Sequence, residues 1–85
     1  MRVSFHKRFK KQLEKNPSLK RKAEERIVLF SGEPFHPILN NHSLTGTWEG
    51  YRNINITGDY RAVYRLIDMD VAYFVDMDTH SNLYK

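Results

Sequence analysis

Gly50–Tyr64 reads Gly-Tyr-Arg-Asn-Ile-Asn-Ile-Thr-Gly-Asp-Tyr-Arg-Ala-Val-Tyr, and the predicted fold is built on this segment. Residue types alternate with period two on both sides of Thr57-Gly58-Asp59, a pattern that predicts two strands joined as a hairpin. Glycine tolerates unusual backbone dihedrals, and aspartate can hydrogen-bond to its own backbone. We therefore expect Gly58 and Asp59 to form the turn.

The same alternation predicts which side chains of the hairpin share a face. One surface should collect Asn53, Asn55, Arg61 and Arg65, with Asp59 beside them at the turn. Two interpretations remain open from the residues alone. The surface is either an ordinary solvated outer face or a platform that binds a phosphate.

Two helices are predicted before the hairpin. Arg2–Phe5 alternates like a short strand, and an amphipathic helix over residues 5–15 follows from apolar residues at four-residue spacing, which are Phe5, Phe9 and Leu13. Asn16 is a good N-cap for a second helix with Pro17 in its first turn, and Gly32 is a natural stop. Their short link predicts an antiparallel helical hairpin.

The remaining segments complete the predicted architecture. Glu33–Pro37 should be a loop, Thr47–Glu49 a short strand that brings Trp48 onto the core or its rim, and Val71–Asp76 the last strand. The class is α+β: a short N-terminal strand and an antiparallel helical hairpin packed on a three- to four-stranded, mainly antiparallel twisted sheet. A chain of 85 residues has room for one core, so we expect a single domain over residues 1–85.

The amino-acid composition argues against several kinds of site and location. The chain has no cysteine and no ligand-spaced histidine cluster, so we expect neither a disulfide framework nor a metal site, and no cofactor. No apolar run approaches the roughly 18 residues of a spanning helix, and Met1-Arg2-Val3 does not begin a signal peptide. We therefore expect no membrane partner and a cytoplasmic location.

Charge is distributed unevenly along the chain. Residues 1–26 hold ten Lys and Arg against three Glu, a net of +7, whereas residues 27–85 hold four basic and seven acidic residues, a net of −3. Such polarity fits a basic half that meets nucleic acid or an acidic protein segment. The alternative is two amphipathic helices with ordinary solvated faces.

The central and C-terminal motifs resemble those of RelE/ParE-superfamily toxins. The block His42-Ser43-Leu44-Thr45-Gly46-Thr47-Trp48-Glu49-Gly50-Tyr51-Arg52 is similar to the pattern of the YafQ-like branch. The ending Thr79-His80-Ser81-Asn82-Leu83-Tyr84 resembles the closing motif of that branch. With the basic helical hairpin ahead of the sheet, the resemblance covers nearly the whole chain.

The resemblance implies the toxin of a type II toxin–antitoxin module, held inactive by a cognate antitoxin. It implies an endoribonuclease (mRNA interferase) that cleaves mRNA on the ribosome by metal-independent acid/base attack of the 2′-hydroxyl. Two alternatives stay open. One is a RelE-fold protein with weakened catalysis that acts mainly as an antitoxin partner, and the other is a ParE-like gyrase inhibitor.

The resemblance also assigns the candidate catalytic residues. His80 and His42 match the histidines of the YafQ-like branch, and histidine suits proton transfer because it titrates near neutral pH. Asp59 matches the catalytic aspartate, which would orient a histidine or act as a base. Arg61 matches the sheet arginine, whose planar fork suits a phosphate.

Further residues are expected to bind the RNA. Tyr60 and Tyr84 would stack on bases, the basic helices would contact ribosomal RNA, and Asn55 would donate to a phosphate in place of a family histidine. The expected substrate-binding set is Arg52, Asn55, Tyr60, Tyr84, Lys10 and Lys11. Asp76 and Asp78 add carboxylates near the site, and we expect Arg52 or Arg61 to pair with Asp76 if phosphate is to bind.

Overall fold

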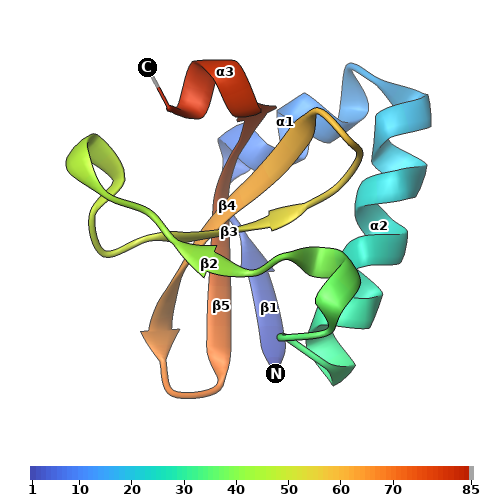
Figure 1. The fold of residues 1–85 in the computed structure, drawn as a ribbon. Coiled ribbons are helices and arrows are strands. Elements are labelled where there is room, and N and C mark those ends of the chain that lie inside the picture. The colour runs from blue at the N-terminus through green and yellow to red at the C-terminus, as the bar shows by residue number, and fades with distance from the viewer. Residues whose placement is uncertain (85) are drawn as a thin grey trace.

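The computed structural model describes residues 1–84 and contains five strands, three α-helices and two short 3₁₀-helices (Figure 1). In chain order the elements are β1 (Arg2–Phe5), α1 (Lys7–Glu14), α2 (Pro17–Gly32), η1 (Pro37–Leu39), β2 (His42–Ser43), η2 (Gly46–Trp48), β3 (Arg52–Asn55), β4 (Tyr60–Asp68), β5 (Val71–Thr79) and α3 (His80–Leu83). The predicted α+β class is confirmed.

The five strands form one sheet in the order β1-β5-β4-β3-β2. β1 pairs with β5 in parallel, and the other neighbouring strands pair antiparallel. The expected count of three to four strands is therefore too low. The sheet gains an edge strand at each side, because β1 joins β5 and the two residues of β2 pair with β3 (Figure 1).

The two helices begin and end close to the predicted positions. Asn16 caps α2 by accepting a hydrogen bond from the backbone N–H of Leu19, with Pro17 in the first turn, as expected. α1 starts at Lys7 rather than at residue 5, because Phe5 belongs to β1 and the His6 side chain caps the helix by accepting from Arg8 N–H.

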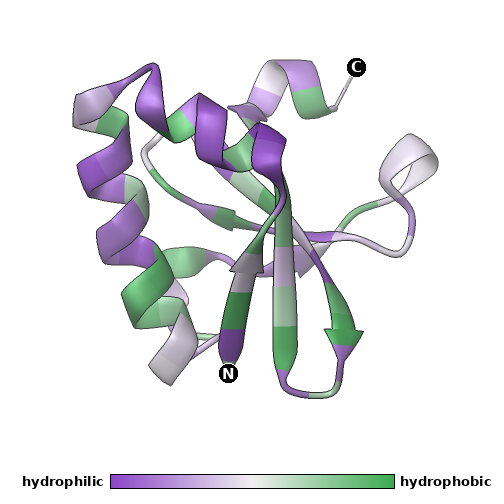
Figure 2. Ribbon diagram, turned by 180° about the vertical axis from the view of Figure 1, so that it is seen from behind, coloured by the Kyte–Doolittle hydropathy of each residue, from purple (hydrophilic) through white to green (hydrophobic). Residues whose placement is uncertain are grey.

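Both helices α1 and α2 cover one face of the sheet, where the main core lies (Figures 1 and 2). In Figure 2 green hydrophobic segments alternate with purple hydrophilic ones along the helices. Phe74 lies at the centre of this core, with its ring 5.4–6.1 Å from those of Phe5, Phe9 and Phe30, and 5.2 Å from that of Tyr64. The core therefore joins β5 to both helices.

A second, smaller cluster lies on the opposite, outward face of the sheet. Leu44, Val63 and Leu83 are buried there, with Trp48 and Tyr51 packed against them. Leu83 comes from α3, so this cluster attaches the C-terminal helix to the sheet. Trp48 lies at the rim of a cluster, as expected, but Thr47–Glu49 is not a strand, since Gly46–Trp48 forms a 3₁₀-helix.

The turn between β3 and β4 differs from the prediction. Thr57 Oγ1 accepts hydrogen bonds from the backbone N–H groups of Asp59 and Tyr60, so Thr57 rather than Asp59 supplies the side-chain bond that caps the turn. The glycines with positive φ are Gly46 and Gly50, not Gly58. A threonine hydroxyl makes the same local bond as an aspartate carboxylate, and the sequence does not tell which of them makes it.

Tyr64 carries a polar group into the helix-facing core. Its hydroxyl donates to Asn41 Oδ1 at 3.0 Å, and Arg52 Nε donates to the same oxygen at 2.9 Å. Burial raises the pKa of the Tyr64 phenol above its ordinary 10.0, although the hydrogen bond to Asn41 and the charge of Arg52 partly oppose the shift. The neutral phenol is thus the form that the fold stabilises.

This raised pKa predicts how stability depends on alkaline pH. Because the pKa is higher in the folded than in the unfolded chain, the contribution of Tyr64 is fully present below pH 10 and is lost as pH rises through the folded value. Urea unfolding measured from about pH 8 to 11 should show a shallower loss of stability in Tyr64→Phe than in the wild type. Tyr51→Phe, the control, should keep the wild-type slope, and equal slopes for all three proteins would contradict the prediction.

Within residues 1–84, no helix is long and apolar enough to cross a membrane.

Candidate active site

The outward face of the sheet places the polar residues of the hairpin in two rows. Asn55 pairs with Arg61, which pairs with Asp78, so these three side chains form one row across β3, β4 and β5. His42 pairs with Asn53 in the adjacent row. The predicted grouping of Asn53, Asn55 and Arg61 on one face therefore agrees with the observed register.

Tyr84 links the second row to the C-terminal segment. Its hydroxyl lies 2.5 Å from His42 Nε2, and Asn53 Nδ2 donates to it at 3.0 Å. On the other side of the imidazole, His42 Nδ1 lies 2.8 Å from the carbonyl oxygen of Asn40. A carbonyl oxygen can only accept, so Nδ1 donates a hydrogen bond to it. Nε2 of the neutral ring then accepts a hydrogen bond from the Tyr84 hydroxyl. His42 is thereby held in one tautomer with its basic nitrogen toward the sheet face.

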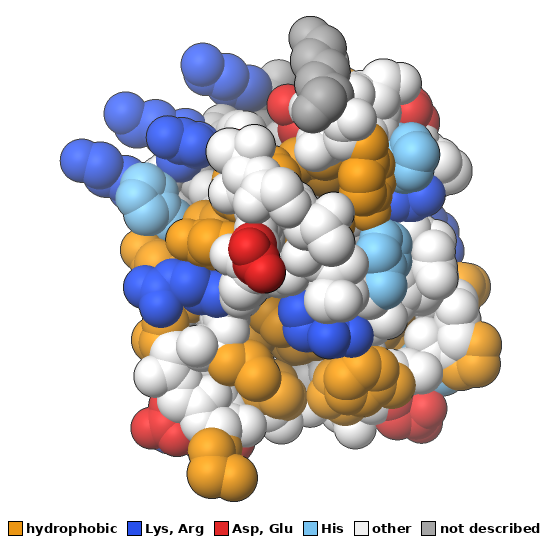
Figure 3. All heavy atoms as spheres, turned by 60° about the vertical axis from the view of Figure 1, so that its left-hand side comes forward, with side chains coloured by type: hydrophobic (Ala, Val, Ile, Leu, Met, Phe, Trp, Pro, Cys, Tyr) orange, Lys and Arg blue, Asp and Glu red, His pale blue; other side chains and the backbone are white. Residues whose placement is uncertain are grey.

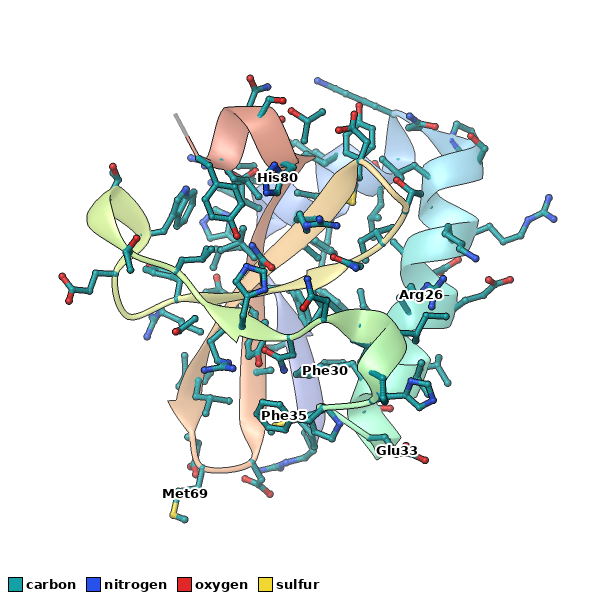
Figure 4. All side chains as sticks on the ribbon, viewed as in Figure 1. Arg26, Phe30, Glu33, Phe35, Met69 and His80 are labelled. Carbon is teal, nitrogen blue, oxygen red and sulfur yellow. The ribbon has the colours of Figure 1, made fainter. Side chains whose placement is uncertain are left out.

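His80 opens α3 directly after β5 (Figure 4). Thr79 caps this short helix by accepting from Asn82 N–H, and His80 N–H donates to the carbonyl oxygen of Asp59 at 2.9 Å. The His80 ring lies 4.4 Å from that of Tyr84, centroid to centroid. His80 and His42 thus both lie against Tyr84. Histidine side chains, pale blue in Figure 3, are seen at the surface of the molecule.

Arg61 lies beside this group with unused hydrogen-bond donors. Its Nε and Nη1 atoms are shielded from solvent and have no hydrogen-bond partner in the described part of the chain, and the same is true of Asn55 Oδ1. The neighbouring Asp78 forms no ion pair with Arg61 within the described residues, and its Oδ1 accepts instead from Thr79 N–H and from Asn82 Nδ2. Donors of a charged group that are buried without partners cost more than about 1–3 kcal/mol, so an anion that reaches them would be favoured.

Asp76 has a different partner from the expected one. Its carboxylate accepts from Gln12 Nε2 at 2.7 Å and lies 3.8 Å from Arg8 Nη1, both on α1. Neither Arg52 nor Arg61 pairs with it. The carboxylate therefore attaches α1 to β5 and is partly neutralised there, which lowers its repulsion of a phosphate at Arg61.

Two of the expected RNA-binding residues lie on the helix-facing side of the sheet. Arg52 pairs with Tyr64 across β3 and β4, bonds to Asn41, and stands 5.3 Å over the ring of Phe35. Tyr60 packs against the main core. Strand alternation turns both away from the face that holds Arg61, so we leave Arg52 and Tyr60 out of the candidate site.

The remaining predicted residues lie at the edge of the group around Tyr84 or outside it. Asp59 is exposed, and its backbone carbonyl accepts a hydrogen bond from His80 N–H, whereas its carboxylate has no hydrogen bond to either histidine among the described residues. Lys10 and Lys11 are exposed on α1, outside the group around Tyr84. The structure thus brings His42, His80, Tyr84 and Arg61 to one face, with Asp59 at its edge.

Asn53 is a site residue that the sequence reasoning did not select. It is fully buried, it donates to the Tyr84 hydroxyl, and its Oδ1 has no partner among the described residues. Its position in the alternating hairpin placed it on the correct face. The sequence does not show that Asn53 lies opposite His42, where its side chain reaches the Tyr84 hydroxyl.

Residues 1–84 contain no group of three or more His, Cys, Asp or Glu side chains that could hold a metal ion. The side chains gathered around Tyr84 on the outward face are two imidazoles, one phenol and one guanidinium. Such a set can move protons at neutral pH and bind a phosphate.

A profile of the family described as "Bacterial toxin of type II toxin-antitoxin system, YafQ" matches residues 1–85. The structure of YafQ from E. coli strain BL21(DE3) is similar over 100% of both chains, with a TM-score of 0.78 and 20% identity. Comparison with the curated proteins gives no match.

Two further solved structures share the fold. The YoeB/ParE toxin from Agrobacterium tumefaciens has a TM-score of 0.76 and 20% identity, covering 94% of this chain and 99% of that one. The E. coli DinJ-YafQ toxin-antitoxin complex contains a chain with a TM-score of 0.75 and 20% identity, covering 98% of this chain and 96% of that one.

Proposed function

The chain belongs to the YafQ family of bacterial toxins of type II toxin–antitoxin systems, and on this premise we propose that it is an endoribonuclease that cleaves mRNA on the ribosome. The observation that carries the proposal is the placement of Arg61, with unpaired guanidinium donors, on the sheet face that holds His42, His80 and Tyr84. A cation with unpaired donors beside two imidazoles is suited to a phosphodiester.

RNA cleavage by this route needs three functions. A base removes the proton of the 2′-hydroxyl, whose oxygen then attacks the phosphorus. An acid gives a proton to the departing 5′-oxygen, and a cation stabilises the charge on the phosphorane. The products are a 2′,3′-cyclic phosphate and a 5′-hydroxyl, so the proton taken at one oxygen is balanced by the proton given at the other.

The residues of the site divide among these functions. His80 is the group free to transfer a proton, because its ring is exposed and meets only Tyr84 among the aromatic residues described. His42 serves as the second proton-transfer group, and its Nε2 exchanges protons through the Tyr84 hydroxyl that it binds. Arg61 binds the phosphate. Asn55 lies next to Arg61 in the sheet, and the Asp59 carbonyl oxygen positions His80 by accepting from its backbone N–H.

The proposed protein partner is a cognate antitoxin. A YafQ chain of similar fold is found in complex with DinJ, and the +7 net charge of residues 1–26 suits an acidic protein segment. The same basic surface, including Lys10 and Lys11, would contact ribosomal RNA when the antitoxin is absent. Competition for one basic surface would make inhibition and ribosome binding mutually exclusive.

Induced expression of the wild type in a bacterial host tests the proposal. We expect growth arrest within the time of a few cell doublings and new mRNA 5′ ends in primer extension, while DNA supercoiling continues. A His42→Ala, His80→Ala double variant is the control for effects of expression alone. Arrest with blocked supercoiling and intact mRNA would instead support a gyrase inhibitor, and no arrest would support a protein that only binds an antitoxin.

A further inference from the structure

A second surface lies on the outward face of the sheet, toward the opposite end of β4 and β5 from the candidate active site. It is a shallow pocket to which α1, η2, β4 and β5 contribute, and no residue of the site lines it. The side chains that define this aromatic pocket are His6, Arg8, Trp48, Tyr51, Arg65 and Tyr73.

The rings of the pocket are held in fixed relative positions. Trp48 and Tyr51 meet edge to face, with centroids 5.2 Å apart and planes at 78°. Tyr73 lies 6.0 Å from the ring of His6, whose Nδ1 is engaged in capping α1. All four residues remain partly exposed, so the rings are oriented by packing and still accessible to a ligand.

Two guanidinium groups flank these rings. Arg65 is exposed, stands 5.8 Å over the ring of Tyr73, and forms no ion pair within the described part of the chain. Arg8 has 63% of its side chain exposed, and its contact with Asp76 is long at 3.8 Å. The pocket therefore offers positive charge beside aromatic faces.

We propose that the aromatic pocket binds an unpaired nucleobase of single-stranded RNA, with the adjoining phosphate on Arg65 and Arg8. Aromatic rings stack on bases of any sequence, and arginine binds phosphate. A duplex keeps its bases stacked inside and is recognised through its backbone, so it cannot fill the pocket. An acidic peptide would neutralise the arginines but leave Trp48 and Tyr73 without a stacking partner.

The position of the pocket relates it to the cleavage site. Arg61 and Arg65 project from the same face of β4, four residues apart, which is roughly 13 Å along a strand. Buried Val63 lies between them. One RNA strand would run along β4 from the pocket to the site, so the base in the pocket lies a few nucleotides from the cut. This inference rests on the proposed function, and it assigns the pocket to substrate selection rather than to chemistry.

Trp48 provides a direct readout because it is the only tryptophan of the chain. We would titrate the wild-type protein with a short 2′-O-methyl RNA oligonucleotide, which lacks the attacking hydroxyl and so cannot be cut. The expected result is saturable quenching of Trp48 fluorescence by the single strand and not by a duplex of the same sequence. Tyr73→Ala and Arg65→Ala should each weaken binding by roughly tenfold.

Phe35→Ala is the control, since it removes an exposed aromatic side chain outside both the pocket and the basic helices and should leave the affinity within about twofold. Arg65→Ala removes an exposed side chain, so it tests the pocket even if Tyr73→Ala fails to fold. Equal quenching by single strand and duplex, or quenching by a polyglutamate peptide alone, would overturn the proposal. A wild type that cleaves mRNA in cells but binds no oligonucleotide at Trp48 would refute the pocket and leave the ribonuclease standing, whereas the reverse outcome would refute the ribonuclease alone.

Discussion

Replacement of His80 by alanine is expected to lower the rate of mRNA cleavage by about 10²–10⁴-fold, the usual contribution of a general acid or base. His80 is exposed at the start of α3, and its ring contacts only Tyr84 among the aromatic residues described. Its loss therefore removes a proton-transfer group without removing core packing. Cleavage should be measured with purified protein in a translating extract, by primer extension on a defined mRNA.

His36→Ala is a matched control for this experiment. His36 caps η1 by accepting from Ile38 N–H and has no hydrogen bond to His42, His80 or Tyr84 within the described residues, so its loss should leave cleavage within about threefold of the wild type. The thermal midpoint of His80→Ala should also stay close to that of the wild type. Full cleavage by a folded His80→Ala protein would remove His80 from the mechanism, and the proton transfers would then have to be reassigned to His42 and Tyr84.

Replacement of Phe74 by alanine is expected to cost about 3–5 kcal/mol of unfolding free energy. Phe74 is fully buried on β5, and its ring packs against those of Phe5, Phe9, Phe30 and Tyr64. A chain of 85 residues has a total stability of about 4–13 kcal/mol at ordinary values per residue. The variant should therefore be close to its unfolding threshold, as measured by urea denaturation with circular dichroism.

Phe35→Ala is the comparison within the same chain. The Phe35 side chain is 68% exposed and lies under the guanidinium of Arg52, so its removal should cost less than about 1 kcal/mol (Figure 4). Similar losses for Phe35→Ala and Phe74→Ala would show that the helix-facing cluster is not the main source of stability. The prediction would then be wrong, whatever the function of the outward face.

In this interpretation one face of the sheet provides stability and the other provides function. The face toward α1 and α2 holds the main core, whereas the outward face holds the candidate site and the aromatic pocket on either side of the small cluster around Val63. Substitutions at His80 and Phe74 therefore test different properties. One should change cleavage at constant stability, and the other should change stability first.

The local elements of this protein could be predicted from its amino-acid sequence. Period-two alternation in Gly50–Tyr64 placed Asn53, Asn55 and Arg61 on one face, and Asn16-Pro17 marked the start of α2, in agreement with the structure. Such features depend on residues that are neighbours along the chain. Strand alternation and helix capping act within a few residues, so their signals are complete in the sequence.

Which residues far apart in the sequence contact one another depends on the tertiary structure. Three long-range contacts have no local signal: the pairing of β1 with β5, the bond from Gln12 to Asp76 across 64 positions and the bond from Tyr84 to His42 across 42 positions. Arg52 shows the same limit, because only the placement of Asn41 and Phe35 shows that its guanidinium is engaged on the helix-facing side. Contacts of this kind depend on how the complete sheet and its helices pack, and packing is a property of the whole fold.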